Sequence, residues 1–131
     1  MLPVVEVVLA TARAATETVF CPTIIMKKVG KVLLNALKEL QNKYRFIGDV
    51  RGRGLMIGVE MVADRKTKEP LDKTITRALF HEALDRGLVT MSYSHVIRIN
   101  PPLIITEDEA LRGVDILDQA FGAIAKRFSL D

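Results

Sequence analysis

The sequence predicts an α+β fold in which a small, mostly antiparallel sheet of three strands is covered by helices. Apolar residues recur at helical spacing in several long segments, and short apolar runs of strand length lie between them. The chain contains no internal repeat and no low-complexity tract. With 131 residues, of which 49% are hydrophobic and 27% charged, it has the size and composition of one globular domain.

The first 28 residues are expected to form a helical linker segment, and residues 29–131 the folded domain. The spacing of Val, Thr and Ala residues over 2–20 favours a helix over a strand. Glu6 and Arg13 interrupt this segment, and the apolar stretch between them is far shorter than the roughly 20 residues that span a membrane. We therefore expect no membrane partner, and interpret the segment as a helix that packs in a core or against another protein.

An amphipathic helix is predicted from Val29 to Leu40. Apolar residues follow Val29 at i+3, i+4, i+7, i+8 and i+11, while lysines and a glutamate occupy the other side. This helix should end near residues 42–44, before a turn at Gly48 and Asp49.

The middle of the chain predicts one strand and one helix. Residues 55–62 form an apolar run of strand length, in which Gly58 is expected to mark the close approach of another backbone. Residues 63–72 are rich in charge and indicate an exposed connection. A second helix is predicted over 74–86, with Gly87 as its C-terminal stop.

Two short strands, 88–91 and 96–100, are predicted to form a hairpin through residues 92–95. The last helix has the clearest start signal, because Thr106 and Glu109 have the spacing of a capping box. Its apolar stripe predicts about 22 residues, or roughly 33 Å of helix.

Arg98 is the candidate binding residue. Side chains alternate along a strand, so Ile97 and Ile99 should point to one face while Val96 and Arg98 point to the other. A guanidinium near apolar surface must reach water, form an ion pair or bind an anion such as a carboxylate in a two-pronged contact. From these residues alone, a structural salt bridge and a substrate-anion site both remain open.

Other motifs favour structural roles. The net charge is only +3 and no arginine-rich strip is present, so no nucleic-acid partner is expected. The glycines of RGRG at 51–54 lead into a strand, which predicts a tight turn instead of a phosphate loop. The motif also predicts close packing at the glycines and ion pairs from Arg51 and Arg53 on alternating sides. Cys21 is the only cysteine, which excludes an internal disulfide and indicates a cytoplasmic protein. His81 and His95 lack further ligands at metal spacing, so no metal site is expected.

Four sequence motifs follow one another along the predicted domain. They are RGRGLMIGVEMV at 51–62, the charged loop DRKTKEP, EALDRGL at 82–88, and VIRINPPLIITEDEALRGVDIL from residue 96. Together, over about residues 29–128, they resemble the C-terminal small domain of class III pyridoxal-phosphate (PLP) aminotransferases. The 4-aminobutyrate aminotransferase branch is the most similar.

The resemblance implies a fold like the C-terminal domain of fold-type-I PLP transferases. Without the family's large domain, the segment 2–19 and one sheet face would be uncovered, so self-association into a homo-oligomer is expected. The resemblance also implies that Arg98 holds the carboxylate of an amino acid or 2-oxo acid substrate. The family's cofactor-binding lysine, its aspartate at the pyridine nitrogen and its phosphate loop belong to a large domain, so the resemblance implies no catalytic or cofactor-binding residue here. PLP would bind to the full-length parent and not to this chain alone.

The leading hypothesis is therefore a small domain, inactive alone, of a transaminase. The parent would move an amino group from an amino acid, such as a 4-aminobutyrate-type ω-amino acid, to a 2-oxo acid. One alternative is a non-catalytic binding or oligomerisation module derived from that domain, which uses the apolar surface that the large domain would cover. Another is a stand-alone sensor that binds a carboxylate through Arg98.

Overall fold

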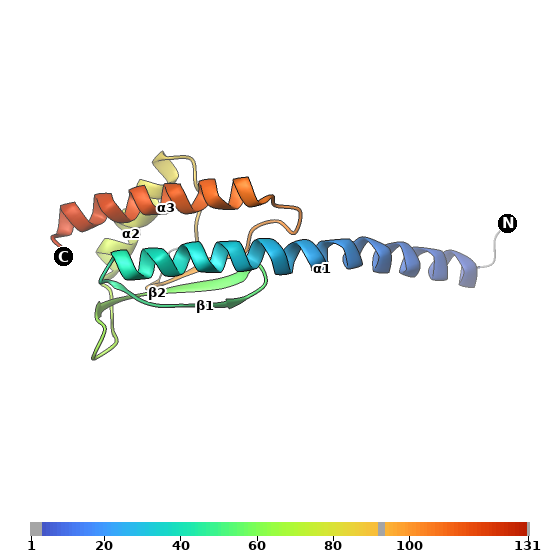
Figure 1. The fold of residues 1–131 in the computed structure, drawn as a ribbon, viewed down its shortest axis with the longest axis horizontal. Coiled ribbons are helices and arrows are strands. Elements are labelled where there is room, and N and C mark those ends of the chain that lie inside the picture. The colour runs from blue at the N-terminus through green and yellow to red at the C-terminus, as the bar shows by residue number, and fades with distance from the viewer. Residues whose placement is uncertain (1–3, 92–93, 131) are drawn as a thin grey trace.

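The computed structural model describes residues 4–91 and 94–130, and the side chains from residue 24 onward within these ranges. Three helices and four short strands occupy this part of the chain (Figure 1). In chain order the elements are α1 (Val4–Lys43), β1 (Ile47–Arg53), β2 (Met56–Asp64), β3 (Glu69–Pro70), α2 (Lys73–Asp85), β4 (Val96–Ile99) and α3 (Glu107–Phe128).

Helix α1 is one continuous helix of 40 residues, whereas the sequence predicted two helical segments. The predicted boundary between the linker and the domain, at residue 28, therefore lies within this helix. Figure 1 shows that the N-terminal part of α1 extends well beyond the sheet and the other helices. From Val29 onward the helix packs on the domain, and Val29, Leu33, Leu37 and Leu40 are buried at the spacing that the sequence predicts.

The C-terminal end of α1 is capped by an arginine from the charged loop after β2. Arg65 donates hydrogen bonds from Nε to the carbonyl of Arg45 and from one terminal nitrogen to the carbonyls of Gln41 and Tyr44. The last carbonyls of a helix have no partner within the helix and carry partial negative charge. One guanidinium therefore binds a carbonyl in the last turn of α1 and the carbonyls of the two residues that follow the helix.

Strand β1 was not predicted from the sequence, where turns were expected at both ends of its span. The turn predicted at 51–54 does occur, but at its last residue, Gly54, with φ of +59°. The turn predicted at Gly48 and Asp49 is wrong, because these residues belong to β1, which pairs with β2 in an antiparallel hairpin. The glycines within β1 have a packing reason, because a Cβ at Gly52 would lie 2.7 Å from the Cα of Ile57. Cross-strand pairing with β2 and burial of Ile47 and Val50 thus outweigh the low strand propensity of glycine.

Strand β2 is the centre of the sheet. It pairs antiparallel with β1 along one edge, with β4 along the other, and with the two-residue β3 near its end. The predicted α+β class with a small antiparallel sheet is confirmed, with four strands instead of three. Of the predicted strand 88–91, only an isolated bridge between Met91 and Arg98 is formed. The predicted 88–100 hairpin is therefore wrong in its pairing, since β4 has its ladder with β2; residues 92 and 93 of its turn lie outside the described residues.

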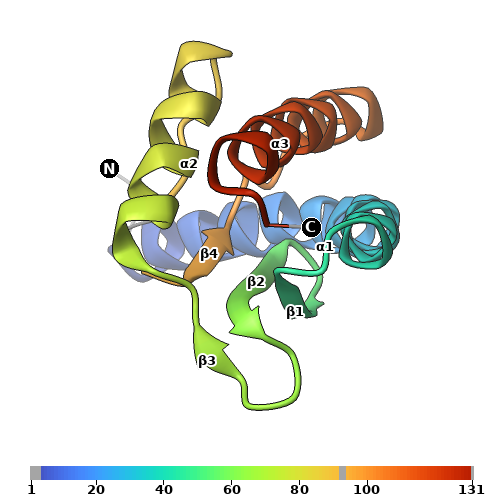
Figure 2. The same cartoon turned by 90° about the vertical axis from the view of Figure 1, so that its left-hand side faces the viewer.

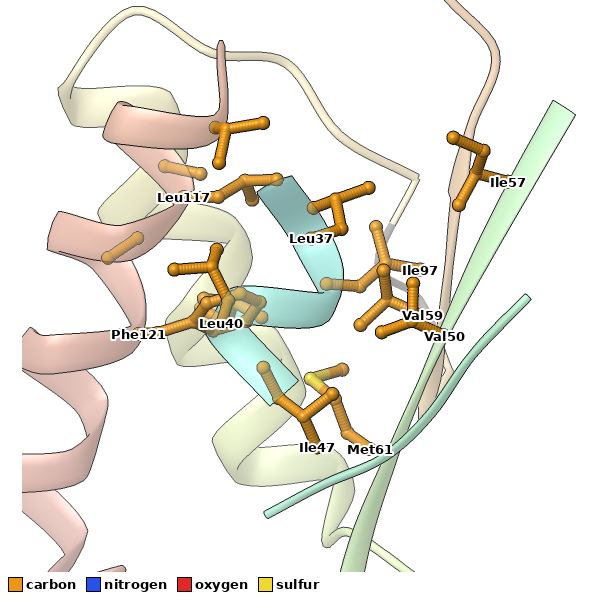
Figure 3. Close-up of a cluster of buried hydrophobic side chains, with 14 of the residues drawn as sticks. Leu37, Leu40, Ile47, Val50, Ile57, Val59, Met61, Ile97, Leu117 and Phe121 are labelled. Atoms are coloured by element: carbon orange, nitrogen blue, oxygen red, sulfur yellow. The ribbon is translucent and has the colours of Figure 1, made fainter. Parts of the chain in front are cut away.

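The helices pack on one face of the sheet and leave the other face open. Figure 3 shows Leu37 and Leu40 of α1 between the side chains of the strands and Phe121 of α3. Figure 2 shows α3 above α1, with α2 beside α3. On the strands the buried side chains that face these helices are Val50, Ile57, Val59, Met61 and Ile97.

Helix α3 agrees with its prediction. It spans 22 residues, and the hydroxyl of Thr106 accepts the backbone N–H of Glu109 while the Glu109 carboxylate accepts the backbone N–H of Thr106 at 2.9 Å. Helix α2 begins at a similar cap, where Asp72 accepts the N–H of Thr74 at 2.7 Å, and it ends before Gly87 with φ of +89°.

A polar contact fastens α3 to the end of α1. Lys43 Nζ and the Tyr44 hydroxyl both donate to the Asp118 carboxylate, at 2.7 Å and 2.6 Å. Partial burial acts to raise the pKa of Asp118, but the Lys43 ammonium and the Tyr44 hydroxyl outweigh it and hold this pKa below its usual value. Within the described part of the chain, no helix has both the length and the apolar character that crossing a membrane requires.

Candidate functional site

Arg98 lies on the open face of the sheet, opposite the helices. Its neighbour Ile97 is completely buried in the core, whereas the Arg98 side chain is exposed. The alternation along β4 thus directs the guanidinium away from the core, as the sequence predicted.

The strand register places Arg98 in a row of four residues across this face. Arg98 pairs with Gly58 of β2, Gly58 pairs with Arg51 of β1, and Met91 forms a bridge with Arg98 from the outer side. Directly paired residues of antiparallel strands project to the same face. The row therefore reads Met91, Arg98, Gly58, Arg51, and the Met91 side chain is 55% exposed.

The two arginines of this row have different surroundings. Arg51 donates to Asp49 at 2.8 Å and to Glu60 at 2.7 Å, and the hydrogen bonds to Glu60 and Asp49 raise the pKa of Arg51. Arg98 has no ion pair with any residue that the structure describes. The sequence left two roles open for Arg98. For one of them, the structural salt bridge, Arg98 has no partner among the described residues.

Gly58 leaves bare backbone between the two guanidiniums. A Cβ built there would meet no atom closer than Cγ1 of Val96 at 3.8 Å and the carbonyl oxygen of Arg51 at 3.9 Å. These are ordinary contacts, so the close backbone approach predicted at Gly58 is wrong. Close approaches occur instead at Gly52, described above, and at Gly30, where a Cβ would lie 2.5 Å from the carbonyl carbon of Gly54.

An apolar cavity of about 380 Å³ lies next to the β4 end of this row. Its walls come from the segment before β4, the prolines after it and the first half of α3, with Leu33 of α1 contributing as well. Arg98 and Glu109 are its charged lining residues. Large apolar side chains nearby in the sequence are exposed, among them Val89 at 75% and Ile104 at 80%.

The remaining candidate residues are not brought together. His81 stacks edge-on against Phe80 with ring centroids 5.5 Å apart, and the carbonyl of His95 accepts the N–H of Met61 at 2.7 Å. The acidic residues at 107–109 form the first turn of α3, and the side chain of Cys21 lies outside the described residues. No group of three or more metal-binding side chains occurs among the described residues.

Ion pairs of Arg51 and Arg53, on alternating sides of a tight turn, were predicted from the sequence. Arg51 does form ion pairs, with Asp49 and Glu60, whereas Arg53 forms none with a described residue. The two partners of Arg51 were not predicted. This arginine was expected in a tight turn, so Asp49 and Arg51 could not be placed two residues apart on one face of a strand. The signal was present, since Asp49, Arg51 and Arg53 alternate with Val50 in the pattern of a strand with one buried face.

The structure defines an α+β domain with an open-faced antiparallel sheet backed by helices, and with an exposed arginine on that face that has no ion pair among the described residues. Comparison with known proteins identifies the family. The profile of the class III aminotransferases matches residues 5–121, and the chain belongs to this family.

Characterised relatives have several activities. The chain is 34% identical over 126 residues to an alanine/serine racemase of Pyrococcus horikoshii, an alignment that covers 92% of this chain and 26% of the racemase. It is 36% identical over 113 residues to a taurine–pyruvate aminotransferase of Bilophila wadsworthia, which covers 79% of this chain and 24% of that enzyme. The chain thus spans about a quarter of the length of these relatives.

Solved structures agree with the fold. An amine transaminase from an uncultivated Pseudomonas species, solved with PLP bound, superposes with a TM-score of 0.73 at 36% identity over 76% of this chain and 23% of that chain. A transaminase solved with L-alanine superposes with a TM-score of 0.80 over 92% of this chain and 28% of that chain, at 24% identity.

PLP is implied by the family, but the described residues do not fit it. A cofactor-binding lysine must be held in a pocket beside groups that bind the pyridine ring and the phosphate. Every lysine in this chain is exposed, and no lysine lines the apolar cavity beside Arg98. Lys43 is engaged with Asp118, and Lys28 forms an ion pair with Glu107 at 3.2 Å.

Proposed function

We propose that this chain is the substrate-carboxylate-binding small domain of a PLP-dependent transaminase. The whole enzyme would transfer an amino group from an amino acid to a 2-oxo acid, and the groups that bind PLP would come from outside these 131 residues. The chain alone would be inactive. Membership of the class III family supports the reaction class, and the family implies the cofactor.

The observation that carries the proposal is the exposed guanidinium of Arg98 on a hydrogen-bonded strand, with no ion pair to any residue that the structure describes. A strand paired along its whole length holds the Cα of Arg98 in place, so the planar guanidinium can accept a carboxylate through two parallel hydrogen bonds. Binding one end of the substrate in this way fixes the position of its reacting carbon, which is how a positioning residue contributes to rate.

The substrate class extends the proposal. One relative is named for alanine and serine, and another for taurine and pyruvate. All four are small molecules with one acidic group. We propose a small amino acid and a 2-oxo acid as the substrates of the parent enzyme, with a 4-aminobutyrate-type ω-amino acid as one candidate donor.

The test uses the arginine-specific reagent phenylglyoxal with peptide mapping by mass spectrometry. Propionate, at constant ionic strength, should slow the modification of Arg98, while propionamide should not, because the amide lacks the charge that the guanidinium binds. Equal modification rates with propionate and with propionamide would contradict the role of Arg98. Because an exposed ion pair contributes only about 0.2–1 kcal/mol, the protection will require high ligand concentrations in this chain alone.

A second function, a binding or oligomerisation module, is supported by the exposed apolar side chains near the cavity. Val89, Met91, Leu103 and Ile104 are each about half exposed or more, and monomeric proteins seldom expose such groups together. We propose that a cytoplasmic homo-oligomer or the large domain covers them. Sedimentation velocity of the chain should then show concentration-dependent association, and a monomer at all concentrations would exclude self-association.

A further inference from the structure

Gly58 differs from the other glycines of the sheet, because neither its backbone nor its packing requires glycine. Gly54 has a positive φ, and at Gly48 and Gly52 a Cβ would lie within 3.0 Å of neighbouring atoms. At Gly58 the φ is not in the left-handed region and the nearest atoms to a Cβ would be 3.8 Å away. The fold would therefore accept a side chain at this position.

A glycine in the centre of a strand also lowers stability. It loses more backbone entropy on folding than other residues and offers no side chain to the cross-strand neighbours, so it is less favourable than alanine. Gly58 lies on the central strand and pairs on both sides, so this loss applies to it in full. Since no packing requirement explains the glycine, the reason for it lies in the space that its missing side chain leaves on the open face.

That space lies directly beside Arg98. Arg98 and Gly58 are a cross-strand pair on the open face, and on the far side of Gly58 the guanidinium of Arg51 is already engaged by Asp49 and Glu60. A side chain at 58 would stand next to Arg98, since the Cβ atoms of directly paired residues lie about 4.5–5.5 Å apart.

We infer that Gly58 is a specificity-determining position for the carboxylate site of Arg98. The ligand's carboxylate and the carbon next to it would lie against the backbone of Gly58, while the guanidinium of Arg98 donates both hydrogen bonds. The inference rests on the proposed role of Arg98 and adds a second residue to it. The ligand class is a small monocarboxylate whose carbon chain lies flat against the strand.

Arg53 provides an internal comparison in the same protein. It is exposed on the same face and has no ion pair with a described residue, but its cross-strand partner is Met56, whose side chain is 70% exposed, instead of a glycine. A guanidinium beside a bare strand and one beside a methionine can therefore be compared in one experiment.

The experiment measures phenylglyoxal modification of Arg98 and Arg53 by peptide mapping, with propionate or propionamide, in the wild type, Gly58→Ala and Gly58→Val. Propionate should protect Arg98 more than Arg53 in the wild type. In Gly58→Val, loss of one of the two charge-assisted hydrogen bonds should lower the apparent propionate affinity of Arg98 about fivefold, to the level of Arg53, with a smaller loss in Gly58→Ala. Circular dichroism and the melting temperature establish that both variants are folded.

The outcomes separate the two proposals. If propionate fails to protect Arg98 in the wild type, the proposed carboxylate role itself is wrong. If it protects Arg98 equally in the wild type and in folded Gly58→Val, the role of Arg98 stands and the inference about Gly58 is overturned. If Gly58→Val does not fold, the comparison rests on Gly58→Ala, where unchanged protection overturns the inference.

Discussion

Replacement of Gly30 by alanine should destabilise the domain, although alanine is the better helix former. Gly30 is buried in α1 where the helix passes the turn between β1 and β2. A Cβ at this position would lie 2.5 Å from the carbonyl carbon and 2.9 Å from the Cα of Gly54, and it would overlap the carbonyl oxygen more severely. Ordinary contacts of this kind are 3.4–4 Å, so the helix and the turn must separate by about 1 Å.

The magnitude follows from two opposing terms. Alanine gains about 1 kcal/mol over glycine in a helix interior. Overpacking of a well-packed core costs about 1–3 kcal/mol, and here the upper end applies because both clashing groups are backbone. We expect a net loss of about 1–2 kcal/mol in the free energy of unfolding.

Urea unfolding followed by circular dichroism measures this loss as a lower midpoint at unchanged m value. The melting temperature should fall by several degrees, since 1 kcal/mol corresponds to about 2–8 °C for domains near this size. The matched control is Gly58→Ala, where a Cβ would meet no atom closer than 3.8 Å and the stability should be unchanged or slightly higher. A Gly30→Ala protein as stable as the wild type would refute the reasoning.

Two further substitutions test polar contacts of α1. Replacing Arg65 with Ala should lower the unfolding free energy by about 1–2 kcal/mol, because the carbonyls of Gln41 and Arg45 lose the hydrogen bonds from its guanidinium, while that of Tyr44 keeps only the N–H of Ile47. Lys should restore little, since one ammonium cannot match the planar guanidinium, and full rescue by Lys in urea unfolding would argue against this geometry. The pKa of Asp118 is lower in the folded state than its ordinary value of 3.8, so ionised Asp118 stabilises the fold. This stabilisation is present above pH 3.8 and is lost as the pH falls through the pKa of the folded state. Asp118→Asn should therefore be less stable than the wild type at neutral pH, and the difference in melting temperature should shrink in acid; a difference that is independent of pH would contradict the assignment.

The elements that were predicted well carry their own local signals. Helix α3 has a capping box at Thr106 and an apolar stripe, and both are properties of nearby residues. The outward direction of Arg98 followed in the same way from alternation within β4. Such features need no knowledge of the partner elements.

The features that were missed depend on partners far away in the sequence. Strand β1 contains Gly48 and Gly52, which resemble turn residues until β2 is known to fill the space beside them. The pairing of β4 with β2 instead of with residues 88–91 is likewise a choice between partners that periodicity cannot decide. The engagement of Arg51 by Glu60 follows from the pairing of β1 with β2, and the position of Arg98 beside Gly58 follows from the pairing of β4 with β2. The surroundings of these two arginines could therefore not be predicted before the sheet was known.

The position of β4 links the proposed carboxylate site to the order in which the chain folds. Strands β1 and β2 adjoin in sequence and can form their hairpin locally, whereas β4 reaches β2 only after the whole of β3 and α2 has intervened. Contacts between distant residues form against a larger loss of chain entropy and tend to form late. The pairing of Arg98 with Gly58 therefore forms only when β4 closes a long loop onto β2. A substitution in β4 can change the rate at which the domain folds as well as what it binds.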